Sequence, residues 1–290
     1  MKQLVTPKQV AQAIGVSESS LKRWCDKGLL PTVRTAGGHR RMAVDAVIQF
    51  LRTNGQPMVR PEVLGLPSTT GQGHTMVDRA RDQMTDALAA GDEEQCRRIV
   101  FDLYLSQHRA SDICDQVLAG ALHQIGDRWE CGELSIYRER RGCEIALRTL
   151  YELRSAVPTP GPTMPLAIGG TLAHDPYKLA TTMVELALCE AGWRAESYGT
   201  MLPAETLCEA LRDTRPRLLW LSVSAFASPA ELLSDCAQLY VTAAECGAAL
   251  AVGGRALDES LRQQMRYSTF CDTLRHLVTF VDTLKSVAAR

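Results

Sequence analysis

The sequence of 290 residues has no uninterrupted apolar run long enough to cross a membrane. A membrane-spanning helix needs about 20 consecutive, mostly apolar residues, so we expect no membrane contact. The first residues, MKQLVTPKQVAQ, also lack the apolar stretch of a secretory signal. The sequence therefore predicts a cytoplasmic protein.

Motifs of catalysis and metal binding are missing as well. The chain has ten cysteines but no CxxC pair and no cysteine–histidine cluster with zinc spacing. The phosphate-binding pattern GxxxxGK[ST] and a nucleophile–base grouping are absent too. Since most cysteines lie in helical patterns, we expect reduced, buried thiols. These absences argue against an enzyme.

The charge is unevenly distributed, although the net charge is only −1. Residues 1–55 contain nine lysines and arginines against Glu18, Asp26 and Asp45, a net charge of +6, so the remainder carries −7. Apolar residues make up 46% and charged residues 22%, as in ordinary soluble globular proteins. A basic module on an acidic body indicates a phosphate-binding head joined to a sensor or partner domain.

Two segments rich in glycine and proline divide the chain into three parts. Residues 56–75 contain GLPS and TTGQG, and residues 157–164 read VPTPGPTM. Such segments interrupt regular structure and are typical of linkers. The sequence therefore predicts three domains, at 1–55, 76–156 and 165–290, joined by linkers at 56–75 and 157–164.

The two larger parts differ in apolar pattern. In 76–156, apolar residues recur every three or four positions, which predicts about four helices, with turns at Gly91, Gly126 and Gly132. After 165, short apolar runs alternate with helical patterns, which predicts a doubly wound, flavodoxin-like Rossmann domain. The expected strands are 165–172, 194–199, 217–224 and 248–254, with a fifth near 267–271; the expected helices are 178–191, 203–213, 229–245 and 272–288.

The first 55 residues read as a winged helix-turn-helix. Thr6 and Pro7 are a preferred start of a helix, Gly15 permits a sharp turn, and Ser17 caps a second helix that ends at Gly28. The second helix of such a unit enters the major groove of DNA. Its predicted groove-facing residues are Ser19, Ser20, Lys22 and Arg23.

The following segment, LLPTVRTAGGHRR, predicts a wing. Two short extended pieces flank Gly37 and Gly38, and a helix is expected at 42–53. Arginine binds phosphate in a bidentate way, and its charge favours the DNA backbone. The residues expected to contact the backbone are Arg34, Gly38, His39, Arg40 and Arg41.

These residues resemble the MerR family. The pattern T-x-x-x-V-A-x-x-x-G-V-S-x-x-x-L-x-R-W-x-x-x-G-L-L-P begins at Thr6, and GGHRR follows it. The resemblance implies binding of double-stranded promoter DNA as a dimer.

Residues 76–290 resemble a cobalamin-binding module made of a helical bundle and a Rossmann domain. The resemblance lies in IGDRWECGELSIYRER (125–140), AHDPYKLA (173–180), SVS (222–224) and VGG (252–254). The whole arrangement is similar to light-responsive, cobalamin-dependent MerR regulators of carotenoid genes. There, adenosylcobalamin holds a repressing tetramer on DNA until light breaks it. The implied pocket residues are Trp129, Glu139, Arg140, Asp175, Tyr177, Ser222, Ser224, Gly253 and Gly254.

The chain departs from that family at its cobalt ligand. The family loop reads Asp/Glu-x-His-x-x-Gly, and the aligned residues here are Asp175, Tyr177 and Ala180; His174 lies three residues early. The bundle signature Trp…Glu-His ends here in Arg140. A phenol keeps its proton up to a pH of about 10, so it is a poor ligand where imidazole is a good one. The methyl group of Ala180 also narrows the channel expected for the nucleotide tail.

Three interpretations of the pocket remain open. It binds no corrinoid; it holds another tetrapyrrole, such as haem on Tyr177 with Arg138, Arg140 and Arg141 at the propionates; or it holds cobalamin base-on or with Tyr177 near cobalt. A metal is expected on Tyr177 or His174 only if a metallotetrapyrrole binds. In each case the sequence predicts a homo-oligomeric regulator, a dimer or tetramer, with repression favoured over activation. The alternative of another class is a protein-interaction regulator, in which residues 76–290 bind an antirepressor protein or another protomer. RNA polymerase is a further candidate partner.

Overall fold

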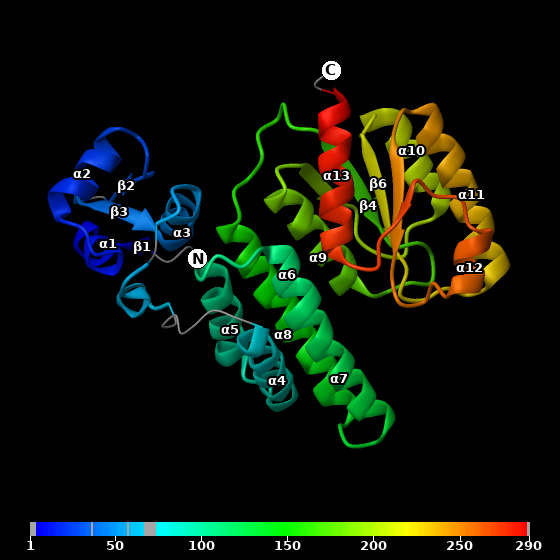
Figure 1. Cartoon of the computed structure of the whole chain (residues 1–290), viewed down its shortest axis with the longest axis horizontal. Coiled ribbons are helices and arrows are strands. Elements are labelled where there is room, and N and C mark those ends of the chain that lie inside the picture. Colours follow the sequence, from blue (N-terminus) through cyan, green and yellow to red (C-terminus); the bar gives the residue numbers. More distant parts are fainter. Residues whose placement is uncertain (1–3, 36, 57, 67–73, 289–290) are drawn as a thin grey trace. The chain divides into compact units, whose positions relative to one another are not determined.

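The computed structural model describes residues 4–35, 37–56, 58–66 and 74–288. The chain divides into two compact units, Met1–Pro158 and Thr159–Arg290. Figure 1 shows helices alone in the second half of the first unit and a sheet covered by helices in the second. Within the described residues, no helix is both long and apolar enough to span a bilayer.

The first unit begins with the head. Its elements are β1 (Leu4–Val5), α1 (Pro7–Ile14), α2 (Glu18–Asp26), β2 (Val33–Arg34), β3 (Arg40–Ala43) and α3 (Val44–Thr53), followed by a short 3-10 turn at Pro61–Leu64. The antiparallel sheet has the order β1-β3-β2. The helix predicted from residue 42 starts instead at Val44, because Met42 and Ala43 still pair with β1.

A four-helix bundle completes the first unit. Its elements are α4 (His74–Ala90), α5 (Glu93–Leu105), a third helix formed by α6 (Ala110–Ile113), a π-helical turn (Cys114–Leu118) and α7 (Ala119–Glu130), and α8 (Ile136–Ala156). Gly91 and Gly132 lie at turns with φ of 79° and 76°, as predicted. The turn predicted at Gly126 is wrong, since this residue lies inside α7. A single glycine costs a helix about 1 kcal/mol, which is too little to end one that is otherwise well packed.

The second unit is a doubly wound α/β domain, as predicted. Its strands are β4 (Leu166–Gly170), β5 (Arg194–Ser197), β6 (Leu218–Ser222), β7 (Ala249–Gly253) and β8 (Thr269–Phe270). All are parallel in the order β5-β4-β6-β7-β8, the flavodoxin-like arrangement. The helices are α9 (Lys178–Glu190), α10 (Ala204–Thr214), α11 (Pro229–Glu245), α12 (Glu259–Gln264) and α13 (Leu274–Ala288). The six-residue α12 was not predicted, because so short a helix leaves little periodicity.

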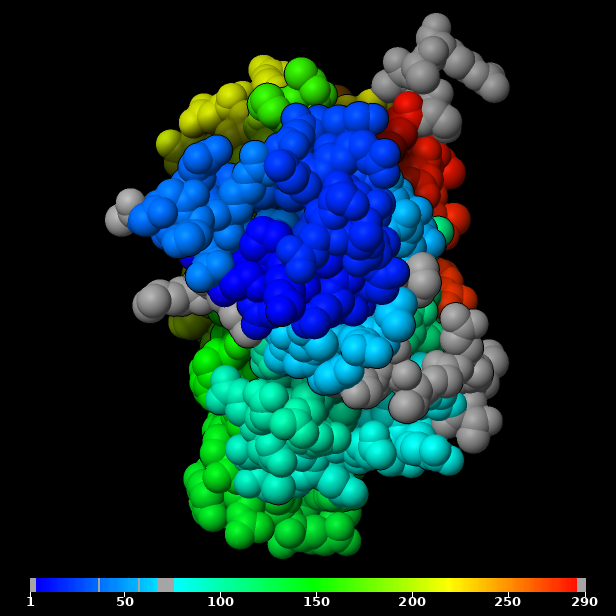
Figure 2. Space-filling model, turned by 90° about the vertical axis from the view of Figure 1, so that its left-hand side faces the viewer, coloured from blue at the N-terminus to red at the C-terminus, as the bar shows by residue number. Residues whose placement is uncertain are grey.

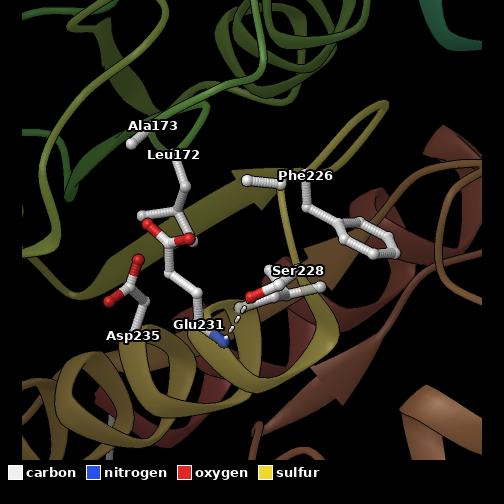
Figure 3. Close-up of a pocket in the computed structure, with 8 residues that line it drawn as sticks. Leu172, Ala173, Phe226, Ser228, Glu231 and Asp235 are labelled. Atoms are coloured by element: carbon white, nitrogen blue, oxygen red, sulfur yellow. Dashed lines mark hydrogen bonds between the residues drawn. The ribbon is translucent and has the colours of Figure 1, made fainter.

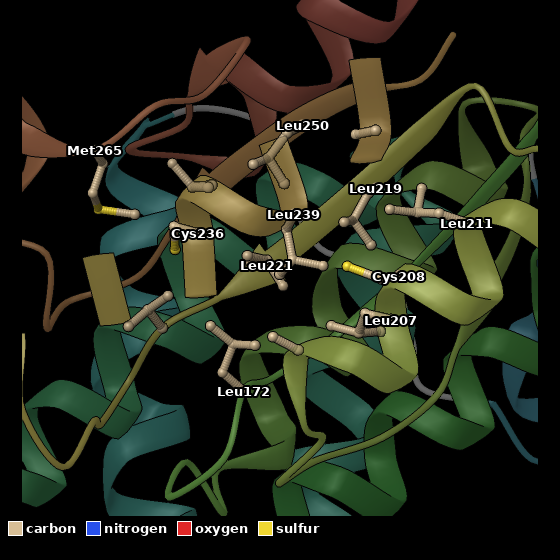
Figure 4. Close-up of a cluster of buried hydrophobic side chains, with 14 of the residues drawn as sticks. Leu172, Leu207, Cys208, Leu211, Leu219, Leu221, Cys236, Leu239, Leu250 and Met265 are labelled. Carbon is tan, nitrogen blue, oxygen red and sulfur yellow. The ribbon is translucent and has the colours of Figure 1, made fainter. Parts of the chain in front are cut away.

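The core of this domain lies between the sheet and helices α10 and α11. Figure 4 shows Leu219 and Leu221 of β6 beside Leu207 of α10 and Leu239 of α11, all fully or almost fully buried. Alternate residues of β6 point to the opposite face, where Trp220 lies buried against α9. The carboxyl ends of the parallel strands meet at one edge, where ligands of such folds bind.

Candidate functional site

Helix α2, the second helix of the helix-turn-helix, follows α1 across a tight turn that helix caps define. The Thr6 hydroxyl accepts from the Gln9 main-chain N–H, and the Gln9 side chain accepts from the Thr6 N–H, which closes a capping box at the start of α1. Gly15 ends α1 with φ of 77°, and Ser17 caps α2 by accepting from the Ser20 N–H. With Leu21 fully buried between these helices, the outer face of α2 is fixed toward solvent.

The residues predicted for the major groove lie on that outer face. Ser19, Lys22 and Arg23 are exposed, and Ser20 is half-buried. The hydroxyl of Ser17 lies 2.8 Å from that of Ser19 and 3.0 Å from that of Ser20. The first turn of α2 thus presents clustered hydroxyls followed by two cations, a chemistry suited to base edges and phosphates.

The wing is a hairpin of β2 and β3. The Thr35 N–H donates to the His39 carbonyl at 2.9 Å, and the Gly38 N–H donates to the Thr35 carbonyl at 2.8 Å. Gly38 has φ of 77°, a conformation that favours glycine. Arg34 and His39 are exposed, and Arg41 is half-buried. In Figure 2 the head, drawn in blue, forms one continuous surface.

The Arg40 side chain forms an ion pair within the head, which the sequence did not predict. Its Nη1 lies 2.8 Å from Oδ1 of Asp26, the last residue of α2. The pair thus ties the wing to the recognition helix. The sequence alone does not indicate that Asp26 pairs with Arg40. An acidic residue in a basic module only lowers its net charge and names no partner.

At the strand edge of the second unit, Asp175 fastens two loops together. This side chain is buried, with 1% of its surface exposed. Its Oδ1 atom accepts a hydrogen bond from the Tyr177 N–H at 3.1 Å, and its Oδ2 atom accepts one from the Ser224 N–H at 2.7 Å. Burial raises the pKa of the Asp175 carboxyl, and these backbone donors lower it in part. Three predicted pocket residues, Asp175, Tyr177 and Ser224, are therefore brought together. Tyr177 itself is exposed at the start of α9.

The predicted pocket glycines lie in close contact with neighbouring backbone. A Cβ atom at Gly253 would be 2.7 Å from the Cys271 carbonyl oxygen, and one at Gly254 would be 2.1 Å from that of Val223. Gly254 also has φ of 128°. Ser222 is buried at the end of β6. Packing within the chain therefore accounts for both glycines without a ligand.

A shallow pocket lies beside this edge and contains none of the predicted pocket residues (Figure 3). It is lined by Leu172, Ala173, Phe226, Ala227, Ser228, Glu231, Leu232 and Asp235. Burial, and then Glu231, raise the pKa of Asp235. His174 has Nε2 at 3.7 Å from Oε1 of Glu231. Within the described residues, no group of three or more histidine, cysteine or acidic side chains is arranged to hold a metal ion.

The predicted pocket residues of the bundle lie in the other unit, near the hairpin between α7 and α8. Trp129 is 43% exposed at the end of α7. Glu139 accepts from the Cys143 thiol at 3.2 Å, and its other oxygen lies 3.4 Å from Nε of Arg140. Burial, and then this hydrogen bond to Glu139, raise the pKa of Cys143 to about 12. Arg141 donates to main-chain carbonyls at the end of α4.

Comparisons with known proteins agree with this domain content. Residues 4–55 match a family model described as a helix-turn-helix domain, and residues 80–153 match one described as a B12 binding domain. The HTH-type transcriptional repressor CarH of Myxococcus xanthus is 26% identical over 266 residues, which cover 85% of this chain and 87% of that protein. The monomethylamine corrinoid protein of Methanosarcina barkeri has a similar fold, with a TM-score of 0.59, 16% identity and coverage of 72% of this chain and 98% of that one.

Proposed function

We propose that this protein is a transcriptional regulator, a repressor of the MerR type, that binds double-stranded DNA through its head. One observation carries the proposal. The helix-turn-helix is complete, and the exposed face of α2 is accompanied by a wing with exposed cations. The similarity to a repressor along most of both chains supports it. A non-catalytic role agrees with the missing catalytic motifs.

In this proposal the two basic elements of the head have different tasks. Ser19, Ser20, Lys22 and Arg23 approach base edges in the major groove, as the second helix of such a unit does. Arg34, His39 and Arg41 meet backbone phosphates, together with the Gly38 main chain. Phosphate contacts set affinity and its salt dependence, whereas base contacts set sequence preference.

We further infer that residues 76–290 form a homo-oligomer, a dimer or tetramer, and couple a signal to DNA occupancy without a histidine-ligated cobalamin. The donors at the strand edge support the absence of a histidine ligand: Tyr177 offers a phenol, and the imidazole of His174 lies beside the Glu231 carboxylate. On the α9 side of the sheet the Trp220 side chain is buried, and its indole N–H donates to Thr181. The residues present therefore do not fit a histidine-ligated corrinoid with a buried nucleotide tail.

Binding of another tetrapyrrole, or of cobalamin in a different ligation, is the second candidate. The B12 binding domain match over 80–153 favours it. The full chain is incubated with adenosylcobalamin, haem or biliverdin in the dark, desalted, and examined by absorption spectroscopy before and after illumination. We expect no retained chromophore. A retained chromophore would favour the second candidate, and retained cobalamin whose spectrum changes in the His174→Ala variant would contradict our inference that no histidine ligates cobalamin.

DNA binding is tested with duplexes that the full chain selects from a randomised pool, by fluorescence anisotropy over a range of salt concentrations. Each phosphate contact contributes about 0.9 to the slope of log affinity against log salt. We expect Arg34→Ala with Arg41→Ala to lower the slope by about 1.8. Arg212→Ala, an exposed arginine of α10, is the control and should leave the slope unchanged. Failure to enrich any duplex would overturn the proposed function.

A further inference from the structure

The ion pair between Asp26 and Arg40 joins the two elements of the head that are proposed to touch DNA. Nη1 of Arg40 lies 2.8 Å from Oδ1 of Asp26, and the two side chains are 30% and 47% exposed. Asp26 is the last residue of α2 and Arg40 the first of β3. The contact therefore joins the wing directly to the end of α2.

The position of Asp26 is unfavourable for α2 itself. The C-terminus of a helix carries a partial negative charge, which repels a carboxylate in the last turn. A carboxylate on a DNA-binding surface is also repelled by phosphates. Both costs are reduced when the Arg40 guanidinium neutralises Asp26. The pairing thus gives Asp26 a function that neither the helix nor DNA binding alone explains.

The register of the wing explains why Arg40 needs this partner. Arg34 and Arg40 lie directly opposite each other on β2 and β3. Like charges at opposite positions of a hairpin repel and destabilise it. Asp26 compensates the charge of Arg40, while Arg34 remains exposed to solvent. The two arginines therefore differ in environment although they are neighbours across the strands.

We propose that Arg40 is a positioning residue that fixes the wing against α2 through Asp26, and that Arg34 and Arg41 supply the phosphate contacts of the wing. This inference rests on the proposed function. It gives Arg40 a role different from the backbone contact expected from the sequence. Arg40 thereby determines how far the wing stands from the recognition helix, and so the geometry with which both reach one duplex.

Substitutions distinguish positioning from phosphate binding by salt dependence. For the full chain on its selected duplex, we expect Arg40→Ala to weaken binding about tenfold, equal to ~1.4 kcal/mol. Because this variant leaves the Asp26 carboxylate unpaired near the DNA, the salt slope is compared between D26N and D26N/R40A, and we expect the two slopes to be equal. Arg34→Ala should instead lower the slope by about 0.9. A comparable fall in slope from D26N to D26N/R40A would overturn the proposal, because it would place the Arg40 guanidinium on a phosphate.

The charge-exchanged double variant D26R/R40D is the decisive test. It keeps the net charge and an ion pair between α2 and β3 but removes the cation from position 40. We expect it to recover most of the affinity lost by Arg40→Asp alone. Lack of recovery, with far-ultraviolet circular dichroism like that of the original chain, would contradict the positioning role.

The variant D26N also distinguishes positioning by Arg40 from phosphate binding by Arg40, because it removes the partner of Arg40 and keeps the arginine. If Arg40 positions the wing, losing its partner should weaken binding even though a negative charge is removed. Stronger binding with a steeper salt slope would show that Arg40 is a phosphate ligand released from competition. If the original chain enriches no duplex, the proposed function itself fails; if it binds but these variants behave otherwise, only this inference fails.

Discussion

The indole N–H of Trp220 donates a hydrogen bond to the Thr181 hydroxyl at 3.0 Å, in the buried space between β6 and α9. The Thr181 hydroxyl also lies 3.3 Å from that of Ser197 on β5. The Trp220 ring lies against Gly169 of β4, where a Cβ atom would be 2.2 Å from ring carbon Cδ2. A tryptophan on β6, a threonine on α9 and a glycine on β4 thus pack against one another on the α9 side of the sheet.

Replacing Thr181 by valine tests this packing. Valine has nearly the same shape but no hydroxyl, so the buried indole N–H of Trp220 loses its partner, at a cost of about 1–3 kcal/mol. We expect a lower urea midpoint for the full chain, followed by tryptophan fluorescence. Thr279→Val is the matched control, since that exposed hydroxyl donates to the Arg275 carbonyl of its own helix. Equal midpoints for both variants would show that the hydrogen bond contributes nothing.

Alanine substitutions at Gly254 and Gly199 separate the cost in stability of backbone conformation from that of steric overlap. Both have positive φ, 128° and 93°, but a Cβ atom would contact Val223 only at Gly254, and nothing lies within 4 Å at Gly199. We expect Gly199→Ala to cost about 1–2 kcal/mol from conformation alone. Gly254→Ala should cost clearly more in the same urea titration. A similar loss for both would remove the packing explanation for Gly254.

The stability of the second unit should depend on pH through Asp175. Burial raises the pKa of this carboxyl in the folded chain above its ordinary value of 3.8. A raised pKa means that the folded state favours the protonated form, so this contribution is full below 3.8 and is lost as pH rises through the folded-state pKa. Asparagine does not titrate. We therefore expect the stability of Asp175→Asn relative to the original chain to increase with pH in this window. Urea unfolding at a series of pH values measures it; a difference that falls with pH would contradict the direction of the shift.

Arg52 joins α3 to the end of α5 within the first unit. Its guanidinium donates to the main-chain carbonyls of Tyr104 and, at 3.1 Å, of His108, and lies 3.7 Å from the centre of the Tyr104 ring. Lysine keeps the charge but has no planar group to stack and donate at once. We expect Arg52→Lys to increase hydrogen exchange in α3 and in the last turn of α5. Arg98→Lys, which affects a surface pair with Glu94, should leave both unchanged. Unaltered exchange in Arg52→Lys would show that charge alone maintains the contact.

Much of the fold was predictable because it depends on local chemistry. Thr6, Gly15 and Ser17 are caps and turns that act within a few residues, and the structure confirms all three. The alternation of apolar runs with helical patterns predicted the parallel sheet, since parallel strands require crossovers. Gly126 was misread as a turn because a glycine alone does not show whether its neighbours continue a helix.

The candidate site was predictable only in part, and for a different reason. The exposed residues of α2 follow from helical periodicity, so their positions agree with the prediction. The pocket residues, in contrast, were predicted only from the resemblance to a cobalamin-binding module. The structure accounts for Asp175 and Gly254 by contacts inside the chain, with the Ser224 N–H and the Val223 backbone. A motif specifies residue types, and the same types serve a ligand or the protein's own loops.

The sequence by itself determined that this protein has a basic helix-turn-helix head, a helical bundle and a doubly wound domain, because caps, periodicity and charge are written in neighbouring residues. Only the tertiary structure decided that Arg40 meets Asp26 and that Trp220 meets Thr181. These pairs join separate elements, so their existence depends on how strands and helices pack. The packing of the elements decides whether a cation contacts a carboxylate or faces solvent, and whether a buried indole N–H finds an acceptor.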